Sequence, residues 1–232
     1  MENVINKNME QKTAQPNKKA FISFYTKGEE IFNAVSHIVG GALGVAAWIV
    51  LMLLAYPNGW HMLAVSAFSL SIIILYTMSA LYHFLPNGRA KGVFRIFDHS
   101  TIFLLIAGTY TPYCLIALQG TAIGFWVLVV EWVCTVAGIA MTAIGLKNIA
   151  VKVINMVLYF TMGWLALVFV PKLFGIVSVP CLVLLLLGGV AYTAGIVFFA
   201  LGRKKRWFHS IWHLFVLAGT ILHFVSVLLM LI

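Results

Sequence analysis

The chain contains seven long stretches of mostly apolar residues, and turn sequences separate several of them. Each stretch is close to the ~20 residues that an α-helix needs to cross the hydrocarbon core of a bilayer. A chain of 232 residues that is 62 % hydrophobic and 9 % charged is typical of an integral membrane protein. We therefore predict an all-α, polytopic membrane protein that folds as a seven-transmembrane helix bundle. The predicted spans are 34–54, 60–83, 94–118, 122–146, 153–171, 179–201 and 209–232.

The basic residues predict how this bundle is oriented. With these spans, all Lys and Arg residues except Lys172 fall on the side of the N-terminus. Because cytoplasmic loops carry an excess of Lys and Arg, we expect a cytoplasmic N-terminus and an external C-terminus. Residues 1–28 are polar and Lys-rich, which predicts a disordered basic cytoplasmic arm without a secretory signal peptide. Residues 29–232 are predicted to form one transmembrane domain.

The net charge of +9 does not indicate a nucleic-acid partner. The basic residues lie in loops and in the arm, and they form no basic face with interleaved aromatic residues. The three cysteines, Cys114, Cys134 and Cys181, lie inside apolar spans without the paired spacing of a thiolate zinc site. We interpret them as small residues of the helix bundle.

Ionisable residues gather at one end of three predicted spans. Ser79 and His83 end the second span, Asp98 begins the third, and His209 and His213 begin the seventh. Residues four apart lie on the same face of a helix, so each of the two pairs points one way. Ionisable groups within a membrane are expensive and usually face the bundle interior. Their shared depth predicts a buried metal site.

Three neutral imidazoles can bind zinc and leave a fourth position for water. The predicted ligands are His83, His209 and His213, and the cofactor is Zn²⁺. Asp98 and Ser79 are the catalytic candidates, since Asp98 can accept a hydrogen bond from the water and Ser79 can orient it. Zinc lowers the pKa of such a water to about 7. A single membrane histidine is more often an ordinary bundle residue, and only the joint pattern favours a metal.

A second polar cluster begins the first span. Glu29, Asn33 and His37 are candidates for a second shell around the metal or for the entrance to the site. Glu30 is interpreted as a helix cap, because acidic side chains are favourable at the positive end of the helix dipole.

Four other residues lie apart from this pattern. His99 follows Asp98 directly, so it is expected to point about 100° away and not to share the target of Asp98. Glu131 lies in the middle of the fourth span, where it needs protonation or an internal partner. His223 is about 21 Å beyond His209 along the helix and so cannot share its metal. Pro112 removes a backbone hydrogen bond and is expected to kink the third span.

Several short runs of residues together resemble a known family. These runs are Glu29-x3-Asn33-x2-Ser36-His37, Ser79-x2-Tyr82-His83, Asp98-His99-Ser100, Gly108-Thr109-Tyr110-Thr111-Pro112 and His209-Ser210-Ile211-Trp212-His213. The chain resembles the progestin and adipoQ receptor superfamily, and specifically its bacterial hemolysin III family. The resemblance implies a multi-pass protein of the bacterial cytoplasmic membrane with a cytoplasmic N-terminus. It also implies zinc on the three histidines, with Asp98 and Ser79 beside its water.

The resemblance favours one function and leaves two alternatives. Related members look like ceramidases and other zinc-dependent membrane lipid hydrolases. We therefore expect a hydrolase of lipid amide or ester bonds in membrane lipid homeostasis, with membrane lipids as substrate or ligand. The alternatives are a cytolytic, pore-forming protein, as the branch name suggests, and a receptor-like lipid sensor with structural zinc. No oligomeric state is predicted.

Overall fold

The structure is a computed structural model that describes residues 25–202 and 204–232. Within these ranges it is helical, and seven helical segments are long and apolar enough to cross a membrane. The prediction of seven spans is therefore confirmed. The elements are α2 (Lys27–Ala55), α3 (Gly59–Phe84), α4 (Arg89–Pro112) with the π-helix η1 (Tyr113–Ala117), α5 (Ala122–Gly145), α6 (Ile149–Trp164) with α7 (Ala166–Leu173), α8 (Val179–Leu201) and α9 (Phe208–Leu231).

Three helices, α2, α4 and α6, begin earlier than hydropathy predicts, and polar side chains cap α2 and α6. Thr26 and Glu29 form a capping box, in which each side chain accepts a hydrogen bond from the backbone N–H of the other residue. The Asn148 side chain accepts a bond of 2.9 Å from the N–H of Ala150 at the start of α6. Lys27 is already helical, so the predicted basic arm ends before it. Residues 1–24, where we predict disorder, lie outside the described residues.

The third span changes its helical form after Pro112. Since proline has no N–H, it cannot continue the regular α-helical hydrogen-bond pattern. In η1, the Leu118 N–H donates to the carbonyl of Tyr113 at 2.9 Å, five residues back. The sequence predicts a kink at Pro112, and the structure has a π-helical turn directly after this residue. The π-helix extends the span to Ala117.

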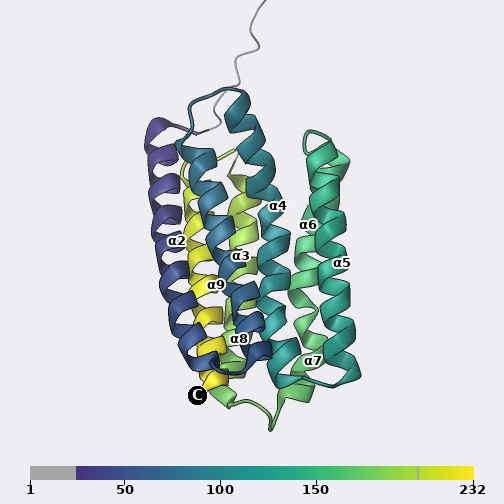
Figure 1. Cartoon of the computed structure of the whole chain (residues 1–232). Helices are drawn as coiled ribbons and strands as arrows, with labels where there is room; N and C mark the ends of the chain where they lie inside the picture. The colour runs from purple at the N-terminus through teal and green to yellow at the C-terminus, as the bar shows by residue number, and fades with distance from the viewer. Residues whose placement is uncertain (1–24, 203) are drawn as a thin grey trace, which may run out of the picture.

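The helices form one bundle in which α9 packs against α2 and α8, and α3 packs against α2 and α4 (Figure 1). Glycines allow close contacts between these helices. A Cβ atom at Gly40 of α2 would lie 2.9 Å from the Tyr76 ring of α3. A Cβ atom at Gly188 of α8 would overlap the His223 ring of α9. Glycine at these positions therefore sets how near the two helices of each pair can approach.

The two ends of the bundle differ in charge. The start of α2 and the C-terminus lie at opposite ends, as an odd number of spans requires (Figure 1). Every described Lys and Arg other than Lys172 lies at or near the end where α2, α4, α6 and α9 begin. His83 ends α3 at this same end, and His209 lies in the first turn of α9 there. The polar site and the basic residues therefore share one end of the bundle.

Candidate metal centre

Three buried imidazoles meet between α3 and α9. The Nε2 atom of His209 lies 3.4 Å from Nε2 of His83 and 3.2 Å from Nε2 of His213. One ligand atom from each of the three residues lies within 4.8 Å of the others, and each residue is at most 5 % exposed. Around a tetrahedral zinc ion with bonds of ~2.0–2.1 Å, neighbouring nitrogens are about 3.3–3.4 Å apart. The cluster can therefore hold a metal ion.

Hydrogen bonds orient two of these rings. Nδ1 of His83 lies 2.7 Å from Oε2 of Glu30, so it donates to the carboxylate. Nδ1 of His213 lies 3.4 Å from Oγ of Ser36, whose own hydrogen goes to the Asn33 carbonyl at 3.0 Å. With Nδ1 protonated, both neutral rings present an Nε2 lone pair to the same point. A cation satisfies such a set of lone pairs, and the residues present fit zinc.

Glu30 lies in the first turn of α2 as expected, but it has a role that the sequence interpretation did not predict. Its carboxylate is not merely a helix cap, because Oε2 binds His83 and Oε1 lies 3.0 Å from Nζ of Lys91. Lys91 also donates to the Leu85 carbonyl at 3.1 Å. The signal for this role lies in the spacing. Glu30 is three residues before Asn33 and seven before His37, which places all three on one stripe of the helix.

The three second-shell candidates of α2 occupy different places. Oε1 of Glu29 accepts a bond of 2.6 Å from the backbone N–H of Trp207, directly before α9. Glu29 thus connects α2 to the helix that carries two histidines of the cluster. The His37 ring stacks on His213, with ring centroids 3.7 Å apart. Asn33 is fully buried, and its side-chain amide has no hydrogen-bond partner in the described ranges.

Asp98 and Ser79 line the cavity that also reaches His209 and His213. Ser79 is buried, and its hydroxyl approaches the Asp98 carboxylate. Oδ2 of Asp98 lies 3.4 Å from Nδ1 of His99. His99 thus approaches Asp98, but it is not part of the three-histidine cluster. Its Nδ1 also lies 3.0 Å from the Arg95 carbonyl.

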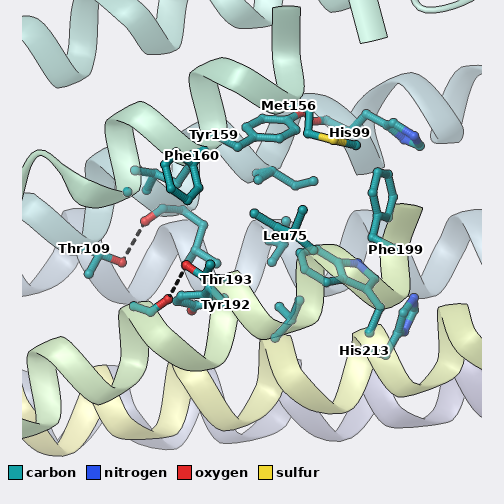
Figure 2. A pocket seen from close by; sticks show the side chains of 18 of the residues that line it. Leu75, His99, Thr109, Met156, Tyr159, Phe160, Tyr192, Thr193, Phe199 and His213 are labelled. Carbon is teal, nitrogen blue, oxygen red and sulfur yellow. Dashed lines mark hydrogen bonds between the residues drawn. The ribbon is translucent and has the colours of Figure 1, made fainter. Parts of the chain in front are cut away.

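The cavity runs from the histidine cluster into the interior of the bundle. Its walls come mainly from α4, α6, α8 and α9, and most of them are apolar or aromatic. Figure 2 shows His99, Phe199 and His213 toward one side of the cavity and Thr109 toward the other. A smaller cavity shares Thr109 and His223 with it. Both cavities have mostly apolar walls.

Two buried ionisable residues lie apart from the three-histidine cluster. His223 is not part of it, as predicted from its spacing. Glu131 is fully buried in α5, and neither of its carboxyl oxygens has a hydrogen-bond partner among residues 25–202 and 204–232. Of the two expectations for Glu131, an internal partner is thus not found among the described residues, and protonation is the alternative that is left. Glu131 also does not line either cavity.

Fold and site together define a polytopic helical membrane protein with a buried cluster of three histidines that can hold a metal ion. The family described as Haemolysin-III related matches residues 25–224. The chain is 36 % identical over 206 residues to the Hemolysin-3 homolog of Bacillus subtilis (strain 168), covering 88 % of this chain and 95 % of the relative. It is 37 % identical over 202 residues to Hemolysin-3 of Bacillus cereus, covering 86 % and 90 %. The chain belongs to the haemolysin III family.

A more distant similarity reaches beyond bacteria. The chain is 22 % identical over 178 residues to the human Monocyte to macrophage differentiation factor, covering 72 % of this chain and 70 % of the relative. This similarity supports membership of the progestin and adipoQ receptor superfamily. The resemblance predicted from the short runs of residues is confirmed.

Proposed function

We propose that the protein is a zinc-dependent hydrolase of lipid amide or ester bonds in the bacterial cytoplasmic membrane. The observation that carries this proposal is the convergence of three imidazole nitrogens beside Asp98, at one end of an apolar cavity. Imidazole suits zinc better than the hard cations magnesium and calcium, which prefer oxygen ligands. When bound, zinc supplies a Lewis acid and lowers the pKa of water at its open position.

The residues around the cluster have separate roles in the hydrolysis. The Asp98 carboxylate takes a proton from the water whose oxygen attacks the carbonyl carbon of the lipid. It then returns that proton to the leaving amine or alcohol as the C–N or C–O bond breaks. The hydroxyl of Ser79, which lies beside Asp98, orients the water. The apolar cavity holds the acyl chain and limits the access of bulk water.

The charge distribution supports a location for the site. Lys and Arg residues gather at its end of the bundle, which favours the cytoplasmic side. The scissile bond of a lipid would then lie close to the headgroups of the inner leaflet. This assignment includes a cytoplasmic N-terminus, an external C-terminus and a transmembrane domain of residues 29–232.

The Asp98→Asn variant tests the proposal. We expect the rate of lipid hydrolysis in detergent to fall at least about 100-fold, because the general base is lost. Zinc content and thermal stability should remain near those of the wild type. Glu131→Gln is the matched control, since it also replaces a buried carboxyl by an amide but lies outside the cavity. Full hydrolysis by a metal-free His209→Ala/His213→Ala double variant would rule out the mechanism.

A receptor-like lipid sensor with structural zinc is the second candidate. The observation that favours it is that the histidines come from two helices, so that a metal ion would join α3 to α9. In that case removal of the metal lowers thermal stability, and neither the wild type nor Asp98→Asn hydrolyses lipid.

A cytolytic function is the third candidate, favoured by the name of the Bacillus cereus relative, Hemolysin-3. A pore needs a continuous polar lining, whereas the cavity described here has mostly apolar walls. Leakage of solute from liposomes that persists in the His209→Ala/His213→Ala variant would favour cytolysis over hydrolysis.

A further inference from the structure

His223 carries an unused hydrogen-bond acceptor deep within the bundle. His223 is 6 % exposed, and its Nε2 lies 3.0 Å from the Leu185 carbonyl. A carbonyl can only accept, so Nε2 holds the proton of this bond. A second proton would create a buried cation at membrane depth, which is costly. Nδ1 therefore presents a lone pair, and it has no partner among the described residues.

The hydroxyl groups of the neighbouring cavity walls already donate elsewhere. Thr220 donates to the Val216 carbonyl at 2.9 Å. The Tyr192 hydroxyl, 2.8 Å from Oγ1 of Thr220, must therefore donate to that oxygen. Thr109 donates to the Leu105 carbonyl at 2.8 Å. These bonds leave none of the three hydroxyl hydrogens for His223.

The fold holds the His223 ring in this arrangement. Gly188 of α8 leaves the space that the ring occupies, because a Cβ atom there would overlap it. The Leu185 carbonyl, one turn earlier on α8, fixes which nitrogen carries the proton. The Tyr192 ring packs against His223, with centroids 5.4 Å apart. The free acceptor thus results from contacts with α8.

His223 also occupies a defined depth in the cavity. It lines both the main cavity and the smaller one that adjoins it. It follows His213 by ten residues on α9, which is about 15 Å along the helix axis. A ligand whose headgroup lies at the histidine cluster would therefore meet His223 partway along its hydrocarbon chain.

We propose that His223 determines ligand specificity by accepting a hydrogen bond from a hydroxyl group in the middle of an acyl chain. Buried polar groups in proteins are almost always paired, and an unpaired acceptor disfavours an occupant that cannot donate to it. The inference rests on the proposed function, in that the cavity holds a lipid chain. It adds the class of lipid, which is one with a mid-chain hydroxyl.

Displacement of radiolabelled octadecanoic acid from the purified full-length protein in detergent tests this inference. The competitors are unlabelled octadecanoic acid, its mid-chain hydroxy derivative and the derivative with a hydroxyl next to the carboxylate. We expect the mid-chain derivative to displace the label from the wild type about three- to tenfold more strongly than the unsubstituted acid. This preference should vanish in His223→Leu. The potency of the derivative hydroxylated beside the carboxylate should not depend on His223.

His223→Gln serves as the second variant, since its amide keeps both a donor and an acceptor, and it should retain part of the preference. Equal displacement by the three acids in the wild type would overturn the inference. A preference for the mid-chain hydroxy acid that is unchanged in both variants would also overturn the inference. Failure of all three acids to bind would overturn it as well.

Lipid hydrolysis by the same preparations of wild type and Asp98→Asn separates this inference from the proposed function. A mid-chain preference without any hydrolysis supports the role of His223 and contradicts the hydrolase. Hydrolysis that requires Asp98, without the preference, contradicts only the role of His223.

Discussion

The Glu30 carboxylate lies between two groups that it can bind at once, the His83 ring at 2.7 Å and the Lys91 ammonium at 3.0 Å. A carboxylate on the far nitrogen of a metal-binding histidine fixes the tautomer and raises the basicity of the ring. Lys91 limits how far Glu30 can turn away from His83. At the scale of single residues, Glu30 thus orients the His83 ring within a cluster that can hold a metal ion.

We predict that Glu30→Gln weakens zinc affinity by about ten- to a hundredfold, because the amide cannot replace the charged acceptor of His83. Competition with a chromophoric chelator measures this change. Glu131→Gln is the control and should leave the affinity unchanged, as it contacts neither cavity. Equal affinities for Glu30→Gln and the wild type would show that Glu30 does not tune the site.

Much of the candidate site could be predicted from spacing. The interval of four between His209 and His213 places them on a common face of the helix. The position of His83 at the end of its span sets its depth in the membrane. The partners of these histidines could be predicted less well. Ser36 bonds to His213 only because α2 packs against α9. Which helices pack together cannot be predicted from the residue spacing within one helix. Glu30 shares a stripe with His37, but its first-turn position equally suits a cap.

At the scale of helices, the start of α9 depends on Glu29. Trp207 precedes α9 with a φ of 64°, a left-handed conformation that is unfavourable for a bulky residue. Its N–H donates to Glu29 at 2.6 Å, which helps to hold this conformation. Because His209 follows two residues later, the Glu29 contact also positions the histidines of α9.

We predict that Glu29→Ala destabilises the protein more than Thr26→Ala does. Thr26→Ala removes one side of a capping box, a loss of about 0.5–2 kcal/mol. Glu29→Ala also removes the acceptor of the Trp207 N–H. Thermal unfolding in detergent should show the lower midpoint for Glu29→Ala, together with weaker zinc binding. Identical midpoints would mean that the bond between Glu29 and Trp207 does not stabilise the start of α9.

Hydropathy predicts that the seven spans exist but not how each one ends or breaks. The sequence Thr-Lys-Gly-Glu at residues 26–29 can be recognised as a capping box. It lies outside the apolar stretch, however, and so outside the predicted span. The division of the fifth span at Leu165 has no Pro or Gly at that residue to predict it. The Leu165 N–H donates to the Met162 carbonyl at 3.1 Å, a local tightening of the helix.

For the whole molecule, the distribution of charge predicts the orientation in the membrane. We expect Lys172→Cys to react with an impermeant maleimide on intact cells, in a variant without the native cysteines. Lys147→Cys should react only after the cells are permeabilised, because it lies at the opposite end of the bundle. The reverse pattern would place the histidine cluster on the external side and would contradict a site at the inner leaflet.

The most direct measurement is X-ray absorption at the zinc edge on purified protein, together with elemental analysis. We predict about one zinc per chain, with three imidazole nitrogens at ~2.0–2.1 Å, and loss of this signal in a His83→Ala/His209→Ala/His213→Ala variant. Zinc retained in full by that variant, or a wild type that binds none after loading, would contradict the account.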